Sequence, residues 1–247
     1  EKNNEKVKIS DYWYESNIDK FDRIHEFDIG FYGYEKVKPY ILKIIEIFQR
    51  LNLNNNIFYQ EISEENYDIK KKSMITFYKG HWQDSRYLDK DDKSLLNKLS
   101  QNITIKKSLK SYKNDSVMIH MRRERYENKV LSIEYYLNAI NMLEEVYGDI
   151  EFNLFTDDKD IIEKLPFKDK LKSINVPSNE SYDTINTFSE MLNNKHFIIA
   201  NSTLSYMAAL IGSVEESKVI MPKPWLNNMN INLKLDGWTE IDCQFEL

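Results

Sequence analysis

The stretch HFIIANSTLSYMAALIGSVEESKVIM, residues 196–221, contains a strand, a helix and a second strand in succession. Residues 196–200 are an apolar run rich in β-formers, residues 203–212 have a helical pattern, and residues 218–221 are another short apolar run. Strands that alternate with helices in this way indicate a parallel β-sheet with right-handed crossovers. This unit therefore predicts an α/β fold.

The same alternation extends upstream and covers the C-terminal half of the chain. The further expected elements are strands at 117–121, 150–156 and 171–176 and helices at 132–147, 158–165 and 181–194. We therefore expect residues 116–247 to form one domain with an open parallel sheet. Residues 1–115 have a less regular pattern, and we treat them as a separate N-terminal domain. The expected elements there are a helix over 35–50, a strand over 74–79 and a capped helix over 91–101.

Composition and charge restrict the classes of function. The 247 residues are 41% hydrophobic and 30% charged, with a net charge of −6, which is typical of a globular protein. Proteins that bind nucleic acid usually carry a basic excess, so we expect no nucleic-acid partner. The one cysteine, Cys243, excludes a disulfide within the chain and a site built from several thiolates.

The sequence contains no apolar run of about 18 residues, the length that a membrane span needs, and no secretory-type start. We expect a cytoplasmic protein whose contact with a membrane, if it has one, is peripheral and at the inner face.

Basic side chains follow the first strand of the predicted sheet. Arg122 and Arg123 come directly after it, beside His120. Ligands of open parallel sheets bind beyond the carboxyl ends of the strands, and guanidinium groups form paired hydrogen bonds with phosphate oxygens. The alternative is a surface cluster in which the arginines pair with Glu124 and Glu127.

Acidic side chains follow the second strand. Asp157 and Asp158 come after Thr156 and can accept hydrogen bonds from a ribose hydroxyl or a guanine edge. Two adjacent carboxylates are weak evidence for a metal site, and we expect none. The alternative is that Thr156 or Asp157 caps a helix beginning near residue 158.

Hydroxyl and amide side chains open the helix of the quoted stretch. They are Asn201, Ser202, Thr203 and Ser205. Hydroxyls and backbone N–H groups at a helix N-terminus can converge on an anion, although an ordinary N-cap explains the same residues. Basic, acidic and hydroxyl groups at one sheet edge together suit a nucleoside diphosphate.

Several segments resemble the ordered motifs of bacterial α-1,2-fucosyltransferases. They are FDRIHEFDI (21–29), YKGHWQDSRYL (78–88), VMIHMRRERY (117–126), IEYYLNAI (133–140), FNLFTDD (152–158), HFIIANSTLSYMAAL (196–210) and KVIMPKPW (218–225). The resemblance implies a GT-B architecture, in which two Rossmann-like halves face a cleft. Residues 116–247 would hold the donor GDP-fucose and residues 1–115 would form the acceptor side.

The resemblance also implies an inverting, metal-independent transfer of fucose to a galactose-type hydroxyl of a surface glycan, such as lipopolysaccharide O-antigen or capsule. Arg122 would bind the diphosphate and stabilise the departing GDP, with His120 and Arg123 in the same motif. Asp157 and Asp158 would lie near the nucleoside. Phosphate or fucose would contact the strand-end group Asn201, Ser202, Thr203 and Ser205.

The sequence departs from that family at two places. The family motif continues Arg-Arg-Gly-Asp-Tyr, whereas residues 122–126 read Arg-Arg-Glu-Arg-Tyr, and no glycine-rich turn opens this sequence. We expect the N-terminal half to lack its first β-loop-α unit. The departures leave two alternatives open: a non-catalytic relative that keeps nucleotide binding, and the same fold with another nucleotide-sugar donor. His81, Asp84 and Glu124 are candidates for the general base by position only.

Overall fold

The computed structural model describes residues 8–9, 35–36, 38–51, 59–63, 73–79, 103–110, 114–123, 129–176, 184–227 and 232–246. The contacts of the chain divide it into two compact units, Glu1–Gln83 and Asp84–Leu247. The second unit includes helix α4 (Ile103–Lys110), which packs against helix α6 (Thr184–Met191). The domain boundary that the sequence predicts, between residues 115 and 116, stays a prediction.

The described residues of the first unit form short parallel strand pairs and a helix. Its elements are β1 (Lys8–Ile9), β2 (Glu35–Lys36), α2 (Pro39–Arg50), β3 (Tyr59–Ser63) and β4 (Ile75–Lys79). Strand β1 pairs with β2, and β3 pairs with β4.

The helix expected over 35–50 begins at Pro39, because proline suits the first turn of a helix, where its missing N–H group is not needed. The strand expected over 74–79 is confirmed as β4, whereas β3, with Gln60 and Glu61 in its middle, was not predicted. The helix expected over 91–101 lies outside the described residues.

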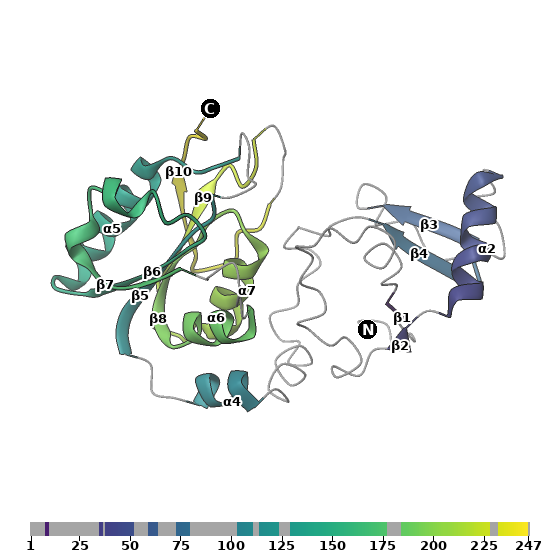
Figure 1. Ribbon diagram of the computed structural model, residues 1–247, viewed down its shortest axis with the longest axis horizontal. Coiled ribbons are helices and arrows are strands. Elements are labelled where there is room, and N and C mark those ends of the chain that lie inside the picture. The colour runs from purple at the N-terminus through teal and green to yellow at the C-terminus, as the bar shows by residue number, and fades with distance from the viewer. Residues whose placement is uncertain are drawn as a thin grey trace. The chain divides into compact units, whose positions relative to one another are not determined.

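The second unit is built on a six-stranded parallel sheet (Figure 1). Besides α4 and α6, its elements are β5 (Asn114–Met121), α5 (Ile133–Tyr147), β6 (Glu151–Thr156), β7 (Leu171–Asn175), β8 (Asn194–Ile198), α7 (Thr203–Gly212), β9 (Val219–Lys223) and β10 (Thr239–Asp242). The prediction of an α/β fold with a parallel sheet is confirmed.

The strand order changes direction at the centre of this sheet. The order is β10-β9-β8-β5-β6-β7, so the chain runs from β5 outward to β7, returns to the other side of β5 as β8, and continues outward to β10. This is the strand order of doubly wound dinucleotide-binding folds. In such sheets the ligand crevice lies where the direction changes, which here is the carboxyl edge between β5 and β8.

Helices cover both faces of the sheet, and the side chains of β5 alternate between them. Val117, Ile119 and Met121 are fully buried in the core that contains α5. Met118 is buried in the core on the opposite face, which contains residues of α4, α6 and α7. Figure 1 shows α5 on one side of the sheet and α6 and α7 on the other. This alternation is the period-two pattern of a strand covered on both faces.

Two parts of the sequence prediction for this unit need correction. The helix expected over 158–165 is wrong, since only two short 3-10 turns, Ile162–Lys164 and Lys168–Lys170, are present. Pro166 disfavours the helical conformation at Leu165, whose backbone is extended. Strand β10 was not predicted, because it is a short edge strand with no fully buried residue.

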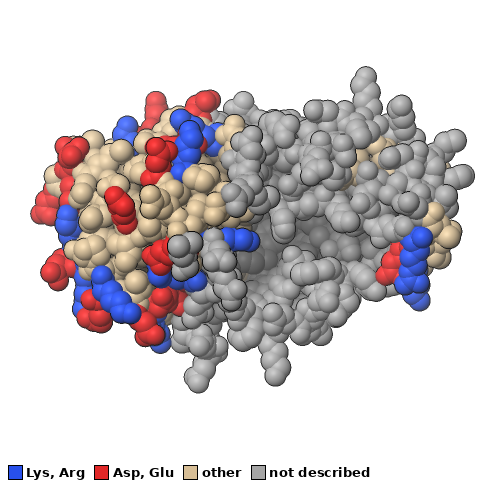
Figure 2. All heavy atoms as spheres, turned by 90° about the horizontal axis from the view of Figure 1, so that it is seen from above, with Lys and Arg blue, Asp and Glu red and all other residues tan. Residues whose placement is uncertain are grey.

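No helix in the described part of the chain is long and apolar enough to cross a membrane. Figure 2 shows lysine and arginine side chains interspersed with aspartate and glutamate over the described surface of the second unit.

The Tyr135 hydroxyl links α5 to β9 and to the residue that follows β8. It is buried and donates to the carbonyl oxygens of Ile199, at 2.7 Å, and Ile220, at 3.3 Å. We predict that Tyr135→Phe lowers the free energy of unfolding by about 1–3 kcal/mol, because it deprives buried carbonyls of a donor. Urea denaturation measures this loss. Tyr147→Phe removes a hydroxyl from a half-buried side chain and is the control; equal losses in both variants would contradict the prediction.

Candidate functional site

Three strand ends meet at the carboxyl edge of the sheet. In the pairing of β5 with β6, Met121 lies opposite Thr156, and in the pairing of β5 with β8, Ile119 lies opposite Ile198. The residues that follow each strand therefore leave the sheet at nearly the same level. The structure brings the predicted basic, acidic and hydroxyl groups to one edge.

Arg122 and Asp157 form an ion pair across this edge. The Nη1 atom of Arg122 lies 2.8 Å from Oδ2 of Asp157, and the two side chains are 30% and 11% exposed. The other oxygen of Asp157 accepts a hydrogen bond of 2.8 Å from the backbone N–H of Arg123. Asp157 therefore orients the Arg122 side chain while leaving part of its guanidinium accessible to solvent.

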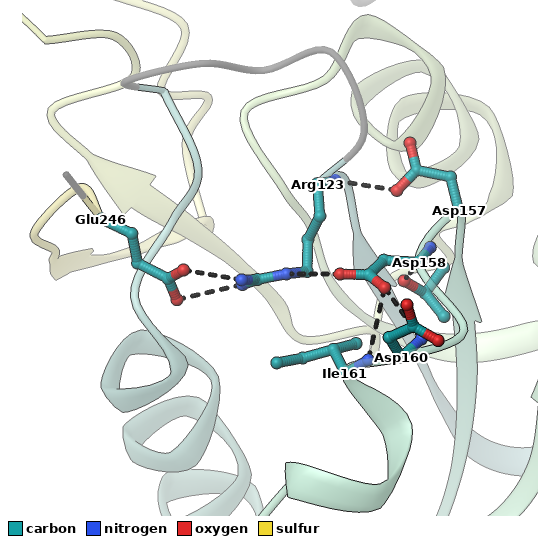
Figure 3. Close-up of polar contacts among 7 residues, drawn as sticks. Arg123, Asp157, Asp158, Asp160, Ile161 and Glu246 are labelled. Atoms are coloured by element: carbon teal, nitrogen blue, oxygen red, sulfur yellow. Dashed lines mark hydrogen bonds and ion pairs between the residues drawn. The ribbon is translucent and has the colours of Figure 1, made fainter.

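Arg123 is held more completely than Arg122. Its Nε donates to Oδ2 of Asp158 at 3.1 Å, and its two terminal nitrogens donate to the carboxylate of Glu246 at 3.0 and 2.6 Å (Figure 3). The side chain is only 15% exposed. The hydrogen bonds to Glu246, more than the other groups nearby, raise the pKa of Arg123 above its ordinary value.

Arg123 therefore lies in an ion cluster, whereas the alternative that the sequence offered, pairing of the arginines with Glu124 and Glu127, stays a prediction. Its partners are Asp158 and Glu246, whereas Glu124 and Glu127 lie outside the described residues. A phosphate contact by Arg123 stays a prediction.

Asp158 organises the turn that follows β6. Its Oδ1 accepts from the backbone N–H groups of Asp160, at 2.9 Å, and Ile161, at 3.3 Å, and its own N–H donates to Oγ1 of Thr156. Thr156 therefore makes a capping contact of the kind that the sequence suggested, and Asp158 makes two more, but together they cap a turn instead of a helix.

The residues after β8 link two loops and begin α7. The side-chain amide of Asn201 donates to the carbonyl oxygen of Lys129 at 2.9 Å, which joins the loops that follow β8 and β5. Ser202 occupies the N-cap position of α7 with an extended backbone, but its side chain makes no capping hydrogen bond. Thr203, the first residue of the helix, is exposed.

Ser205 is fully buried, and its hydroxyl donates to the carbonyl oxygens of Ala200 and Ser202. In this structure Ser205 therefore supports the turn before α7. A contact between Ser205 and a ligand stays a prediction.

His120 lines a small pocket at the same edge, together with Arg122, Thr156, Asp157 and Thr187. The imidazole is 5% exposed, and its Nδ1 has no hydrogen-bond partner in the described part of the chain. Burial, and then the nearby charge of Arg122, lower the pKa of His120 to about 3. The imidazole is therefore neutral at pH 7. It can donate a hydrogen bond to a ligand or accept one without adding charge to the site.

Sequence reasoning missed three contributors to this site. Glu246, Thr187 and the carbonyl of Lys129 are distant in sequence from the motifs they contact or adjoin, and no local pattern marks them. Of the other candidates, His81, Asp84, Glu124 and Arg125 lie outside the described residues. Among the described residues, no group of three or more His, Cys, Asp or Glu side chains is arranged to hold a metal ion.

The lowered pKa of His120 predicts a dependence of stability on pH. The unfolded chain binds the proton near the ordinary pKa of 6.5 and the folded chain only near 3, so unfolding takes up a proton between these values. The contribution of His120 is complete above pH 6.5 and falls by up to about 1.4 kcal/mol per pH unit below it. We predict that His120→Gln flattens the fall in unfolding free energy between pH 7 and pH 5. Parallel curves for the two proteins would contradict this origin.

Comparisons with known proteins identify the family of the chain. The sequence profile of glycosyl transferase family 11 matches residues 34–242. An α-1,2-colitosyltransferase of Escherichia coli is 26% identical over 206 residues, which cover 78% of this chain and 70% of that protein. The O-antigen biosynthesis glycosyltransferase WbnK of Escherichia coli is 30% identical over 137 residues, 51% of this chain and 45% of that protein.

No solved structure gives a significant match to the chain. The family profile nevertheless spans most of its length. The chain therefore belongs to glycosyl transferase family 11, and the enzyme class predicted from its sequence, a fucosyltransferase-like glycosyltransferase, is confirmed.

Proposed function

We propose that the chain transfers fucose from GDP-fucose, in α-1,2 linkage, to a galactose-type hydroxyl of a surface glycan such as lipopolysaccharide O-antigen or capsule. One observation carries the proposal. At the change of strand direction, a partly exposed arginine and the N-terminus of a helix without a side-chain cap follow adjacent parallel strands. This is where doubly wound folds bind nucleotides.

The diphosphate of the donor is assigned to Arg122 and the first turn of α7. The N–H groups of that turn and the helix dipole favour negative charge, and the dipole of a ten-residue helix is close to its full strength. The Thr203 hydroxyl is exposed at the same helix end. Asn201 and Ser202 set the backbone of this turn, and the neutral His120 lies beside Arg122.

Asp157 and Asp158 are assigned to the nucleoside side of the site. Both carboxylates already engage arginine or backbone donors. Each carboxylate oxygen has two lone pairs, so a further hydrogen bond from a ribose hydroxyl or guanine edge is compatible with these contacts.

The reaction places its largest charge change on the phosphate. The bond between the anomeric carbon of fucose and the β-phosphate oxygen breaks, and its electron pair goes to that oxygen. The acceptor hydroxyl oxygen forms the new bond from the opposite face and loses its proton. We assign stabilisation of the departing GDP to Arg122 in place of a metal ion, because a fixed cation aimed at developing charge lowers the barrier. The general base is unassigned.

We further propose a GT-B arrangement in which residues 116–247 bind the donor and the N-terminal half binds the acceptor glycan. The enzyme would act on the cytoplasmic side, where it would contact the membrane only at its surface. The name of the relative WbnK, an O-antigen biosynthesis glycosyltransferase, supports a surface glycan as the acceptor.

A second candidate keeps the reaction and changes the sugar. The similarity to an α-1,2-colitosyltransferase favours a nucleotide-sugar donor that carries colitose. The third alternative is a chain that binds nucleotide without transferring sugar. The charge change at Arg125, where the family motif has aspartate, favours that alternative.

We predict that the chain binds GDP more tightly than UDP and that Arg122→Ala weakens GDP binding about ten- to a hundredfold, the effect of losing a charge-assisted hydrogen bond. Isothermal titration calorimetry measures both. Lys170→Ala is the control, because Lys170 forms an exposed ion pair with Glu144 on the same unit. Absence of nucleotide binding by the unchanged chain would contradict the donor assignment.

Sugar transfer separates the three alternatives. Incubation with a galactose-terminated acceptor and either GDP-fucose or GDP-colitose, followed by mass spectrometry, reports which sugar is added. The proposal predicts the fucosylated product. Transfer of colitose alone selects the second candidate, and GDP binding without transfer of either sugar selects the non-catalytic relative.

A further inference from the structure

Residues 243–246, here named the clasp segment, lie against the loop that follows β5. The backbone N–H of Glu246 donates to the carbonyl of Val130 at 2.8 Å, and the N–H of Ser132 donates to the carbonyl of Gln244 at 2.9 Å. On its other side the N–H of Cys243 donates to the carbonyl of Lys223 at 2.8 Å. Backbone contacts with two different parts of the second unit therefore fix the position of Glu246.

Glu246 is the last residue in a row of ion-paired side chains of alternating charge at the candidate site. Its carboxylate receives both terminal nitrogens of Arg123, the paired geometry that a planar guanidinium forms best. The remaining side-chain nitrogen of Arg123 contacts Asp158 (Figure 3). The row therefore runs from Glu246 through Arg123 to Asp158, across positions that are far apart in the sequence.

This row of ion pairs adjoins the residues that were assigned above to the donor nucleotide. Asp158 uses its second oxygen to order the backbone N–H groups of Asp160 and Ile161. The backbone N–H of Arg123 holds Asp157, which in turn pairs with Arg122. The Arg123 side chain therefore contacts Asp158 directly, whereas its link to Asp157 and Arg122 runs through the backbone of Arg123.

We propose that Glu246 is a positioning residue of the donor site. It holds the Arg123 side chain in place, and Arg123 in turn supports the loop after β6. Arg122, and not Arg123, then binds the diphosphate. The effect on nucleotide affinity rests on the proposed function, whereas the ordering of the loop does not.

The competing arrangement makes Glu246 a resident anion that the donor phosphate displaces from Arg123. Two observations oppose it. The clasp segment is fixed by its backbone, and Arg123 is simultaneously bound to Asp158 and largely buried. The two arrangements predict opposite changes in nucleotide affinity when the charge of Glu246 is removed.

The test compares Glu246→Gln, which keeps the shape and removes the charge, with Glu240→Gln as the matched control. Glu240 also pairs with basic side chains, Lys223 and Lys234, but at the surface of β10. In Glu246→Gln we expect hydrogen exchange at the amides of Arg123, Asp160 and Ile161 to accelerate about tenfold, and GDP to bind about three- to tenfold more weakly. The control leaves both unchanged, and Glu246→Asp, which restores the charge, recovers part of both effects.

Exchange rates that are the same in Glu246→Gln and the unchanged chain would overturn the proposal. Tighter binding of GDP by Glu246→Gln would also overturn it, in favour of the resident anion. If the unchanged chain binds no nucleotide, the proposed function fails, and the exchange rates alone decide whether Glu246 orders the loop.

Discussion

The change of strand direction between β5 and β8 is the constraint on which the rest of the second unit depends. Because successive strands are added on opposite sides of this pair, the connections after β5 and β8 leave the sheet in different directions. The carboxyl edge between them is therefore not covered by a crossover. Arg122 follows one of these strands and Asn201 the other, and the hydrogen bond from Asn201 to the carbonyl of Lys129 joins the two loops.

At this edge of the sheet the adjacent residues Arg122 and Arg123 have different surroundings. Arg122 is paired with Asp157 and is about twice as exposed as Arg123, whereas Arg123 lies between Asp158 and Glu246 with each side-chain nitrogen engaged. Neighbouring residues at a strand end point in different directions, so one can face a ligand while the next supports the loop. A basic pair in a motif therefore need not contribute two phosphate contacts.

Much of the second unit could be predicted from its sequence, because each strand that is buried on both faces contains or adjoins a short apolar run. This holds for β5, β6, β8 and β9, and α7 begins and ends where its pattern indicated. The helix expected over 158–165 was wrong, because the Asp158 carboxylate accepts from the N–H groups of Asp160 and Ile161 in a turn and Leu165 is extended before Pro166. Strand β10 could not be recognised, since an edge strand buries too little to show a pattern.

The candidate site was predictable in its composition but not in its contacts. Residue types at strand ends indicated an anion site, and the structure brings them to one edge. The partner of Arg123 could not be found, because Glu246 is 123 positions away and is brought close only by the tertiary fold. For the same reason the burial of Ser205, which turns its hydroxyl to the backbone, could not be read from the motif.

A crystal structure of the chain with GDP tests most directly whether the carboxyl edge between β5 and β8 holds a nucleoside diphosphate. We predict electron density for the diphosphate between Arg122 and the first turn of α7, with the ion pairs of Arg123 intact. Density for GDP at another edge of the sheet, or phosphates bound to Arg123 after displacement of Glu246, would contradict it.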